Sequence, residues 1–174
     1  MAGFGGQGVL SMGQVIAYCG ASEGREVSWI PSYGPEMRGG TANCSVCVSD
    51  KPISSPMVSE PDILVAMNEP SLDKFEKMVR PGGLIFANLS LITRKCERDD
   101  VTAHYIDASQ MAVEMGNVKV ANMIMLGALL AADPIIDTKS VIRILEQVWP
   151  ASKHHLLPIN ARALEKGAAL TGSQ

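Results

Sequence analysis

Two strand-like apolar runs, residues 62–68 and 83–90, flank a segment that has the pattern of an amphipathic helix. Pro70 suits the first turn of such a helix, and Pro81 with the two glycines after it ends the helix. Apolar residues recur between them at helical spacing: Leu72, Phe75, Met78 and Val79. Strand, helix and strand in this order form a βαβ unit, in which the two strands are parallel. The sequence therefore predicts an α/β fold around a parallel sheet.

The rest of the chain continues this alternation and then becomes helical. Further strands are expected at 26–30, 41–49 and 103–107, and further helices at 7–22, 110–116, 120–133, 137–149 and 158–170. Because proline suits a sheet edge better than its centre, we expect residues 41–49 and the proline-punctuated 51–58 to form an edge hairpin. The prediction is one domain, residues 1–174, with a Rossmann-like three-layer fold, a mostly parallel sheet and a helical C-terminal third.

The chain begins with a glycine motif of the form G-x-G-x-x-G, at Gly3, Gly5 and Gly8. Such a loop turns tightly, brings backbone N–H groups close to an anion, and starts a helix whose positive end faces that anion. Only Met1 and Ala2 precede it, whereas an average strand has about 5–6 residues. We therefore expect a first strand that is short or absent, in a numbered chain that starts late.

A simple NAD site is not favoured. Dinucleotide folds place an acidic residue at the end of the second strand, where it holds a ribose. The expected second strand, residues 26–30, has its only carboxylate, Glu26, at the opposite end.

Composition and charge exclude several other classes of protein. The net charge of −3 without a basic run gives no reason to expect a nucleic acid. The longest apolar run is too short to span a membrane, and the four cysteines lack the pattern of a disulfide framework, so a reducing cytoplasm is expected. Cys44 and Cys47 lie three apart in an expected strand, on opposite faces, and are interpreted as structural thiols. No metal site and no catalytic residue is predicted, and His104, His154 and His155 are interpreted as structural.

The stretch PSYGPEMRGG, residues 31–40, is the most unusual in the chain. Its prolines stiffen the backbone, and its glycines allow special backbone angles. Residue types that are enriched at interfaces stand between them: Tyr33, Met37 and Arg38. We favour a contact loop on a rigid scaffold. A rigid surface turn with a local pair of Glu36 and Arg38 is the alternative.

Several runs resemble the gamma subunit of 2-oxoacid:ferredoxin (acceptor) oxidoreductases: GFGGQGV, PSYGPEMRGGTANCSV, ISSP, EPDILVAMN and the closing NARALEKG. The resemblance extends from Gly3 to about Gly167. The residues of the SYGPEMRGGTAN run are closer to the 2-oxoglutarate and branched-chain types than to the pyruvate type. It implies a non-autonomous subunit of an enzyme that converts a 2-oxoacid, 2-oxoglutarate by preference, and coenzyme A into acyl-CoA and carbon dioxide, with electrons passed to ferredoxin. A branched-chain 2-oxoacid or indolepyruvate enzyme is the alternative within the family.

The resemblance also implies partners and a binding role. Thiamine diphosphate would lie between alpha and beta subunits, and iron–sulfur clusters would lie in the beta subunit and a ferredoxin-like delta subunit. This chain would help to bind coenzyme A, with Arg38 as the best candidate for a phosphate contact. The residues expected at that site are Gly3, Gly5, Gly6, Gln7, Gly8, Ser32, Tyr33, Gly34, Glu36, Arg38, Gly39 and Gly40. A pure assembly module without a ligand is the competing hypothesis.

Overall fold

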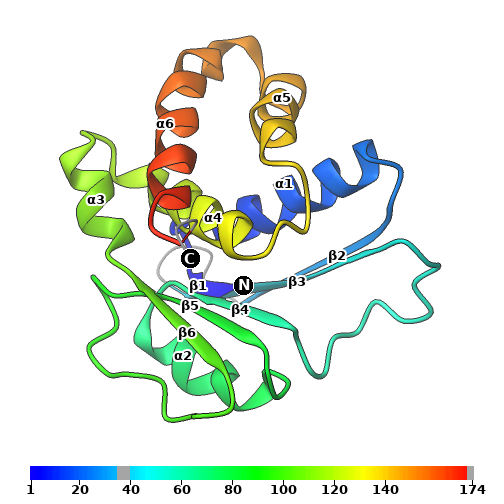
Figure 1. The fold of residues 1–174 in the computed structure, drawn as a ribbon. Helices are drawn as coiled ribbons and strands as arrows, with labels where there is room; N and C mark the ends of the chain where they lie inside the picture. The colour runs from blue at the N-terminus through cyan, green and yellow to red at the C-terminus, as the bar shows by residue number, and fades with distance from the viewer. Residues whose placement is uncertain (35–39, 172–174) are drawn as a thin grey trace.

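The computed structural model describes residues 1–34 and 40–171, which form one sheet with helices on both faces (Figure 1). The sheet has six strands in the order β2-β3-β1-β4-β5-β6. Their bounds are β1 Ala2–Phe4, β2 Glu26–Tyr33, β3 Thr41–Ser49, β4 Ile63–Ala66, β5 Leu84–Asn88 and β6 Thr102–Ile106. The strands β1, β4, β5 and β6 are mutually parallel, and β3 runs antiparallel to both β1 and β2. The prediction of a three-layer α/β fold with a mostly parallel sheet is confirmed.

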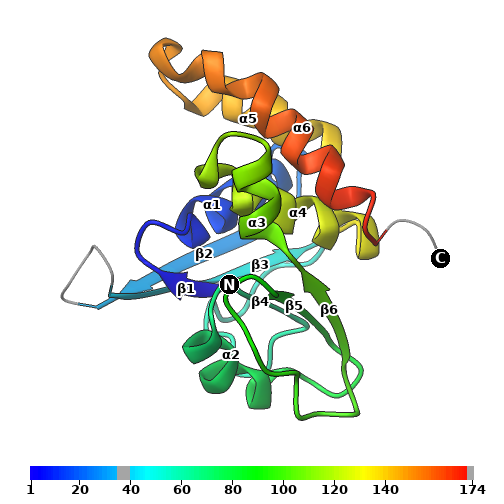
Figure 2. The same ribbon diagram turned by 90° about the vertical axis from the view of Figure 1, so that its left-hand side faces the viewer.

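One face of the sheet is covered by more helices than the other (Figures 1 and 2). One face carries α1 (Val9–Ser22) and α4 (Ala121–Ala132), with α5 (Thr138–Val148) and α6 (Leu157–Ala168) packed outside them. The opposite face carries α2 (Glu69–Phe75) beneath β4 and β5. The helix α3 (Ala108–Glu114) follows β6. Short 3₁₀ turns complete the chain: η1 Glu76–Met78, η2 Val118–Val120 and η3 Ala151–Leu156.

The main core lies between the sheet and the α1/α4 layer, and the C-terminal helices close it. The apolar α4 is buried on all sides between residues 121 and 130, as its composition predicts. Gly127 of α4 and Gly167 of α6 let the two helices cross in backbone contact, because a Cβ at either position would clash with a carbonyl group of the other helix. A second apolar cluster lies between the sheet and α2. No helix in the described ranges is both long and apolar enough to cross a bilayer.

The predicted edge hairpin exists, but the segment predicted to pair with residues 41–49 was wrong. The strand β3 pairs along its whole length with β2, and residues 51–58 form no strand. The expected end of β2 at Ile30 was also wrong, because the strand continues through Pro31 to Tyr33. Pro31 lies opposite Cys44, whose N–H donates to Met1 on the other side of β3. The pair is therefore a non-hydrogen-bonded one, and the missing N–H of Pro31 faces the open edge of the sheet, where proline is tolerated.

Candidate functional site

The glycine motif forms the turn between β1 and α1, at the carboxyl edge of the sheet. Gly6 and Gly8 have φ angles of 98° and 75°, in the left-handed region that glycine adopts without strain. Gly8 caps α1, and among residues 1–34 and 40–171 no side chain caps the first N–H groups of this helix. A Cβ added to the exposed Gly6 would meet no atom within 4 Å. The loop thus presents open backbone and a helix N-terminus, an arrangement that can bind an anion.

The second predicted wall of the site begins beside this loop. Because β1 and β2 run in the same direction, their carboxyl ends reach the same edge of the sheet. The N–H of Gly5 donates to the carbonyl of Gly40 at 2.9 Å, and the N–H of Gly34 donates to Thr41 at 3.0 Å. The exposed Ser32 lies in β2 rather than in the loop. Tyr33 ends that strand, whereas Glu36, Arg38 and Gly39 lie outside the described residues.

Gln7 points its side chain into the sheet and joins β1 to β4. Its Oε1 accepts from the backbone N–H of Phe4 at 2.6 Å, and its Nε2 donates to the carbonyl of Met67 at 3.3 Å. In a regular parallel ladder those two backbone groups would pair with each other. The amide of Gln7 therefore replaces one ladder bond where the two strands separate.

Two buried asparagines extend this contact across the carboxyl edge. Asn68 follows β4, donates to Gln7 Oε1 at 3.0 Å, and accepts from the N–H of Ser71, which caps α2. Asn88 ends β5 and donates to the carbonyl of Met67 at 3.3 Å and to the hydroxyl of Ser109 at 2.8 Å. A continuous chain of amide contacts thus fixes the carboxyl ends of β1, β4 and β5 relative to one another.

The other side of the glycine loop rests on α4. The Nδ2 of Asn122 donates to the carbonyl of Gly8 at 3.3 Å. A Cβ at Gly8 would lie 2.5 Å from that same nitrogen. Gly8 is therefore required both by its backbone angle and by the close approach of Asn122.

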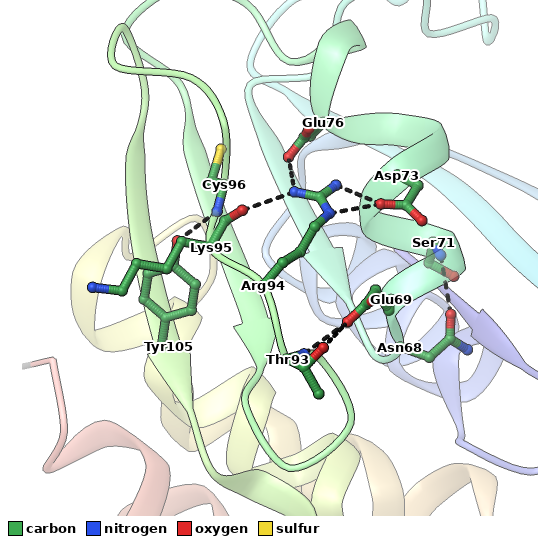
Figure 3. Close-up of polar contacts among 10 residues, drawn as sticks. All are labelled: Asn68, Glu69, Ser71, Asp73, Glu76, Thr93, Arg94, Lys95, Cys96 and Tyr105. Atoms are coloured by element: carbon green, nitrogen blue, oxygen red, sulfur yellow. Dashed lines mark hydrogen bonds and ion pairs between the residues drawn. The ribbon is translucent and has the colours of Figure 1, made fainter.

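The loop between β5 and β6 is fastened to α2 by charged side chains (Figure 3). Arg94 donates to Glu76 at 3.0 Å and to Asp73 at 2.7 Å, and these hydrogen bonds, that to Glu76 foremost, raise its pKa. Glu76 is only 1% exposed, so this carboxylate depends on Arg94. Glu69 accepts from both the N–H and the hydroxyl of Thr93, and these hydrogen bonds lower the pKa of Glu69. The charges of this region are thus used within the chain.

The contacts of the histidines and of the Cys44 thiol are structural ones. His104 stacks on Phe86 with ring centroids 4.9 Å apart, and burial lowers its pKa. His154 contacts the carbonyl of Trp149 at 3.0 Å. The Cys44 thiol lies against α1, where it donates to the carbonyl of Val9, whereas Cys47 points to the other face of β3. Across residues 1–34 and 40–171, no group of three or more His, Cys, Asp or Glu side chains could hold a metal ion.

Sequence reasoning missed the amide residues that support the loop: Asn68, Asn88 and Asn122. A signal was present, because both strands of the βαβ unit end in asparagine, in DILVAMN and in LIFAN. Polar residues that end neighbouring parallel strands meet at one edge of the sheet, where ligands of such folds bind.

The chain is similar to several curated proteins, among them two subunits with different names. It is 42% identical to the ketoisovalerate oxidoreductase subunit VorA of Methanothermobacter thermautotrophicus over 97% of this chain and 35% of that protein. It therefore spans about a third of the length of that relative. It is 36% identical to the 2-oxoglutarate synthase subunit KorC of Methanocaldococcus jannaschii over 81% of this chain and 77% of that protein.

Two solved structures share the fold of this chain. A 2-oxoglutarate:ferredoxin oxidoreductase from Magnetococcus marinus, solved with 2-oxoglutarate, coenzyme A and succinyl-CoA bound, matches 99% of this chain and 30% of its own with a TM-score of 0.88 and 27% identity. The gamma subunit of a keto/oxoacid ferredoxin oxidoreductase from Geobacter sulfurreducens matches 99% of this chain and 96% of its own with a TM-score of 0.81 and 24% identity, a likeness of fold. Residues 1–170 match the family described as pyruvate ferredoxin/flavodoxin oxidoreductase, and the chain belongs to that family.

Proposed function

We propose that this chain is the gamma-type part of a 2-oxoacid:ferredoxin oxidoreductase, where it contributes to coenzyme A binding and to assembly. The complete enzyme would convert a 2-oxoacid and coenzyme A into acyl-CoA and carbon dioxide and pass the electrons to ferredoxin. Thiamine diphosphate and iron–sulfur clusters would belong to alpha, beta and ferredoxin-like delta partners. The observation that carries the proposal is the open glycine loop at the N-terminus of α1, next to the loop that ends at Gly40.

The described part of the site fits a phosphate group of coenzyme A. Gly6 is exposed and leaves space for a ligand, and the first turn of α1 offers N–H groups that no side chain of the described residues caps. Backbone N–H groups at a helix N-terminus favour an anion through hydrogen bonds and through the helix dipole. The role of these residues would be to bind and orient coenzyme A, whose thiol supplies the acyl acceptor. Arg38 stays a predicted phosphate contact.

The identity of the 2-oxoacid remains a matter of proposal. The names of similar proteins divide between ketoisovalerate, at 42% identity, and 2-oxoglutarate, at 36%. The higher identity, over a larger share of this chain, favours a branched-chain substrate, and the 2-oxoglutarate preference stays a prediction. Rates of the reconstituted complex on 2-oxoglutarate, ketoisovalerate, pyruvate and indolepyruvate would decide between them.

The coenzyme A role can be tested by a charge placed in the first turn of α1. Ser11 is exposed there, so Ser11→Glu adds a carboxylate near the N–H groups that would hold the phosphate. The same carboxylate should stabilise the helix by about 0.3–1 kcal/mol. In the complex with its partners, we expect the Michaelis constant for coenzyme A to rise about tenfold, or ~1.4 kcal/mol. The uncharged Ser11→Gln is the matched control and should change neither quantity.

Ser11→Glu is expected to raise the stability of the chain and to lower its affinity for coenzyme A. Misfolding would lower both, so the two measurements together separate a ligand effect from misfolding. If Ser11→Glu leaves the Michaelis constant unchanged in an intact complex, the loop is not a coenzyme A site and the assembly module is favoured. Arg38→Ala gives a second measure, because a lost contact with coenzyme A raises the same constant, whereas a lost subunit contact weakens copurification. The isolated chain should reduce no viologen dye with a 2-oxoacid and coenzyme A.

A further inference from the structure

The apolar helix α4 has one polar residue in its buried stretch, Asn122. The other buried residues between 121 and 130 are aliphatic, methionine or glycine. Asn122 is only 7% exposed, and a buried amide costs free energy unless its polar atoms find partners. An apolar residue would match the rest of the helix, so the amide at this position needs a specific reason. Its partner lies outside α4, in the glycine loop.

That partner is the carbonyl of Gly8, the residue that caps α1. The Nδ2 of Asn122 donates to this oxygen at 3.3 Å, and the N–H of Met12 donates to the same oxygen at 2.9 Å. The bond from Met12 is the first of the helix and already satisfies the carbonyl. The bond from Asn122 is therefore not needed for satisfaction. It restrains the direction of the carbonyl instead, because the two donors approach the oxygen from different helices.

The direction of the Gly8 carbonyl decides where the first N–H of α1 points. This carbonyl and the N–H of Val9 belong to one trans peptide, so they point in opposite directions. The carbonyl points along α1 towards Met12, and the N–H of Val9 therefore points out of the helix N-terminus. Val9 is only 1% exposed, which fixes the other end of the peptide in the core. The Gly8–Val9 peptide is thus held on both sides, with its N–H turned outward.

We propose that Asn122 is a positioning residue for coenzyme A binding, which orients the Gly8–Val9 peptide so that the Val9 N–H faces the phosphate at the N-terminus of α1. The proposal rests on the coenzyme A role proposed above and adds to it a residue 114 positions away in the chain. Asn122 acts through the loop and does not touch the ligand. An N–H that is fixed in its bound direction beforehand needs no ordering on binding, so loss of the restraint weakens the affinity.

Asn122→Leu tests the proposal without opening a cavity, because leucine has the same branched shape as asparagine. The carbonyl of Gly8 keeps its bond from Met12, so the melting temperature of the chain should not fall. In the complex with its partners, the Michaelis constant for coenzyme A should rise roughly threefold to tenfold, the range that one ordinary hydrogen bond supplies. The rate at saturating coenzyme A and the Michaelis constant for the 2-oxoacid should not change.

Asn122→Ala is the second variant, for the case in which leucine is too large for the space beside Gly8. It removes the same amide and leaves more room, so it should lower the melting temperature and still raise the Michaelis constant for coenzyme A. An unchanged constant in both variants, measured in intact complexes, would overturn the proposal.

Asn160→Leu is the matched control in the same layer of helices. Asn160 is also a buried amide, 6% exposed, and its Nδ2 donates to the carbonyl of Leu156 at 2.7 Å, where η3 meets α6. This variant should leave the Michaelis constant for coenzyme A unchanged. An equal rise in the Asn122 and Asn160 variants would show that any disturbance of the helical layer loosens the site, and it would overturn the proposal.

The result for Ser11→Glu separates a failure of this inference from a failure of the proposed function. If Ser11→Glu raises the Michaelis constant for coenzyme A and neither Asn122 variant does, the coenzyme A site stands and Asn122 only packs against the loop. If all three variants leave this constant unchanged, the coenzyme A role fails together with the inference. An equal rise in the Michaelis constant for the 2-oxoacid would also overturn the proposal, because it would reveal a general effect on the complex.

Discussion

The two halves of the sheet use their polar groups differently. In the parallel half, β4 to β6 with α2, charged and amide side chains are satisfied by other groups of the same chain, as Arg94 is by Glu76 and Asp73 (Figure 3). In the half formed by β1 to β3 with α1, backbone groups stay open at the carboxyl edge of the sheet. The glycine loop presents these groups at the N-terminus of α1.

This difference separates stability from recognition. A half whose charges are paired internally has few groups left for a ligand, whereas exposed backbone on a rigid scaffold is available for one. The two halves meet at Gln7, because its side chain joins β1 to β4 and contacts Asn68. We therefore expect substitutions in the parallel half and at Gln7 to act on folding, and a charge placed beside the glycine loop to act on coenzyme A binding.

The largest effect is expected for Arg94→Met. The change removes the partner of Glu76, a carboxylate only 1% exposed, and a buried charge without its partner costs roughly 3–5 kcal/mol. Chemical denaturation of the isolated chain measures this loss. Arg80→Met is the matched control, because Arg80 and its partner Asp62 are 53% and 72% exposed and such pairs contribute about 0–1 kcal/mol.

A double variant sharpens this test. Adding Glu76→Gln to Arg94→Met removes the unpaired charge and should recover much of the lost stability. If the single variant unfolds at the same denaturant concentration as the Arg80 control, the pair does not fasten the β5–β6 loop.

A smaller loss is expected for Gln7→Ala, at the junction of the two halves. It leaves the N–H of Phe4 and the carbonyl of Met67 without the side chain that joins them, which costs about 1–3 kcal/mol. Gln14→Ala, on the next turns of α1, breaks only a contact with the exposed Tyr18 and should cost less than about 0.5 kcal/mol. Equal midpoints of unfolding for these two variants would contradict the bridging role.

The fold was predictable where the periodicity of apolar residues agrees with the prolines and glycines that begin and end helices. The βαβ unit follows from Pro70, Pro81 and the apolar stripe between them, and β4, α2 and β5 appear there. The partner of β3 was not predictable in this way, because residues 51–58 and 26–33 both carry strand-type residues with proline. Only the register shows that Pro31 faces the open edge, and that information is tertiary.

The backbone conformation at the candidate site was predictable. The glycine spacing indicated an open turn before a helix, and the structure has one. The role of Gln7 was not predictable, because it depends on the separation of β1 from β4 after only three residues. Asn122 contacts the loop from 114 positions away, which local pattern cannot show.

The smallest expected effect is a pH dependence confined to the parallel half. Burial lowers the pKa of His104, whereas the unfolded chain takes up this proton near the ordinary value of about 6.5. Between the two pKa values the unfolded chain binds more protons, so this part of the stability falls as the pH drops from about 6.5 towards the lower pKa of the folded chain. His104→Phe keeps a ring beside Phe86 and should flatten the decline in melting temperature between pH 7 and pH 5. The control His155→Gln, at an exposed position of η3, should not change it, and the interpretation fails if both variants keep the original slope.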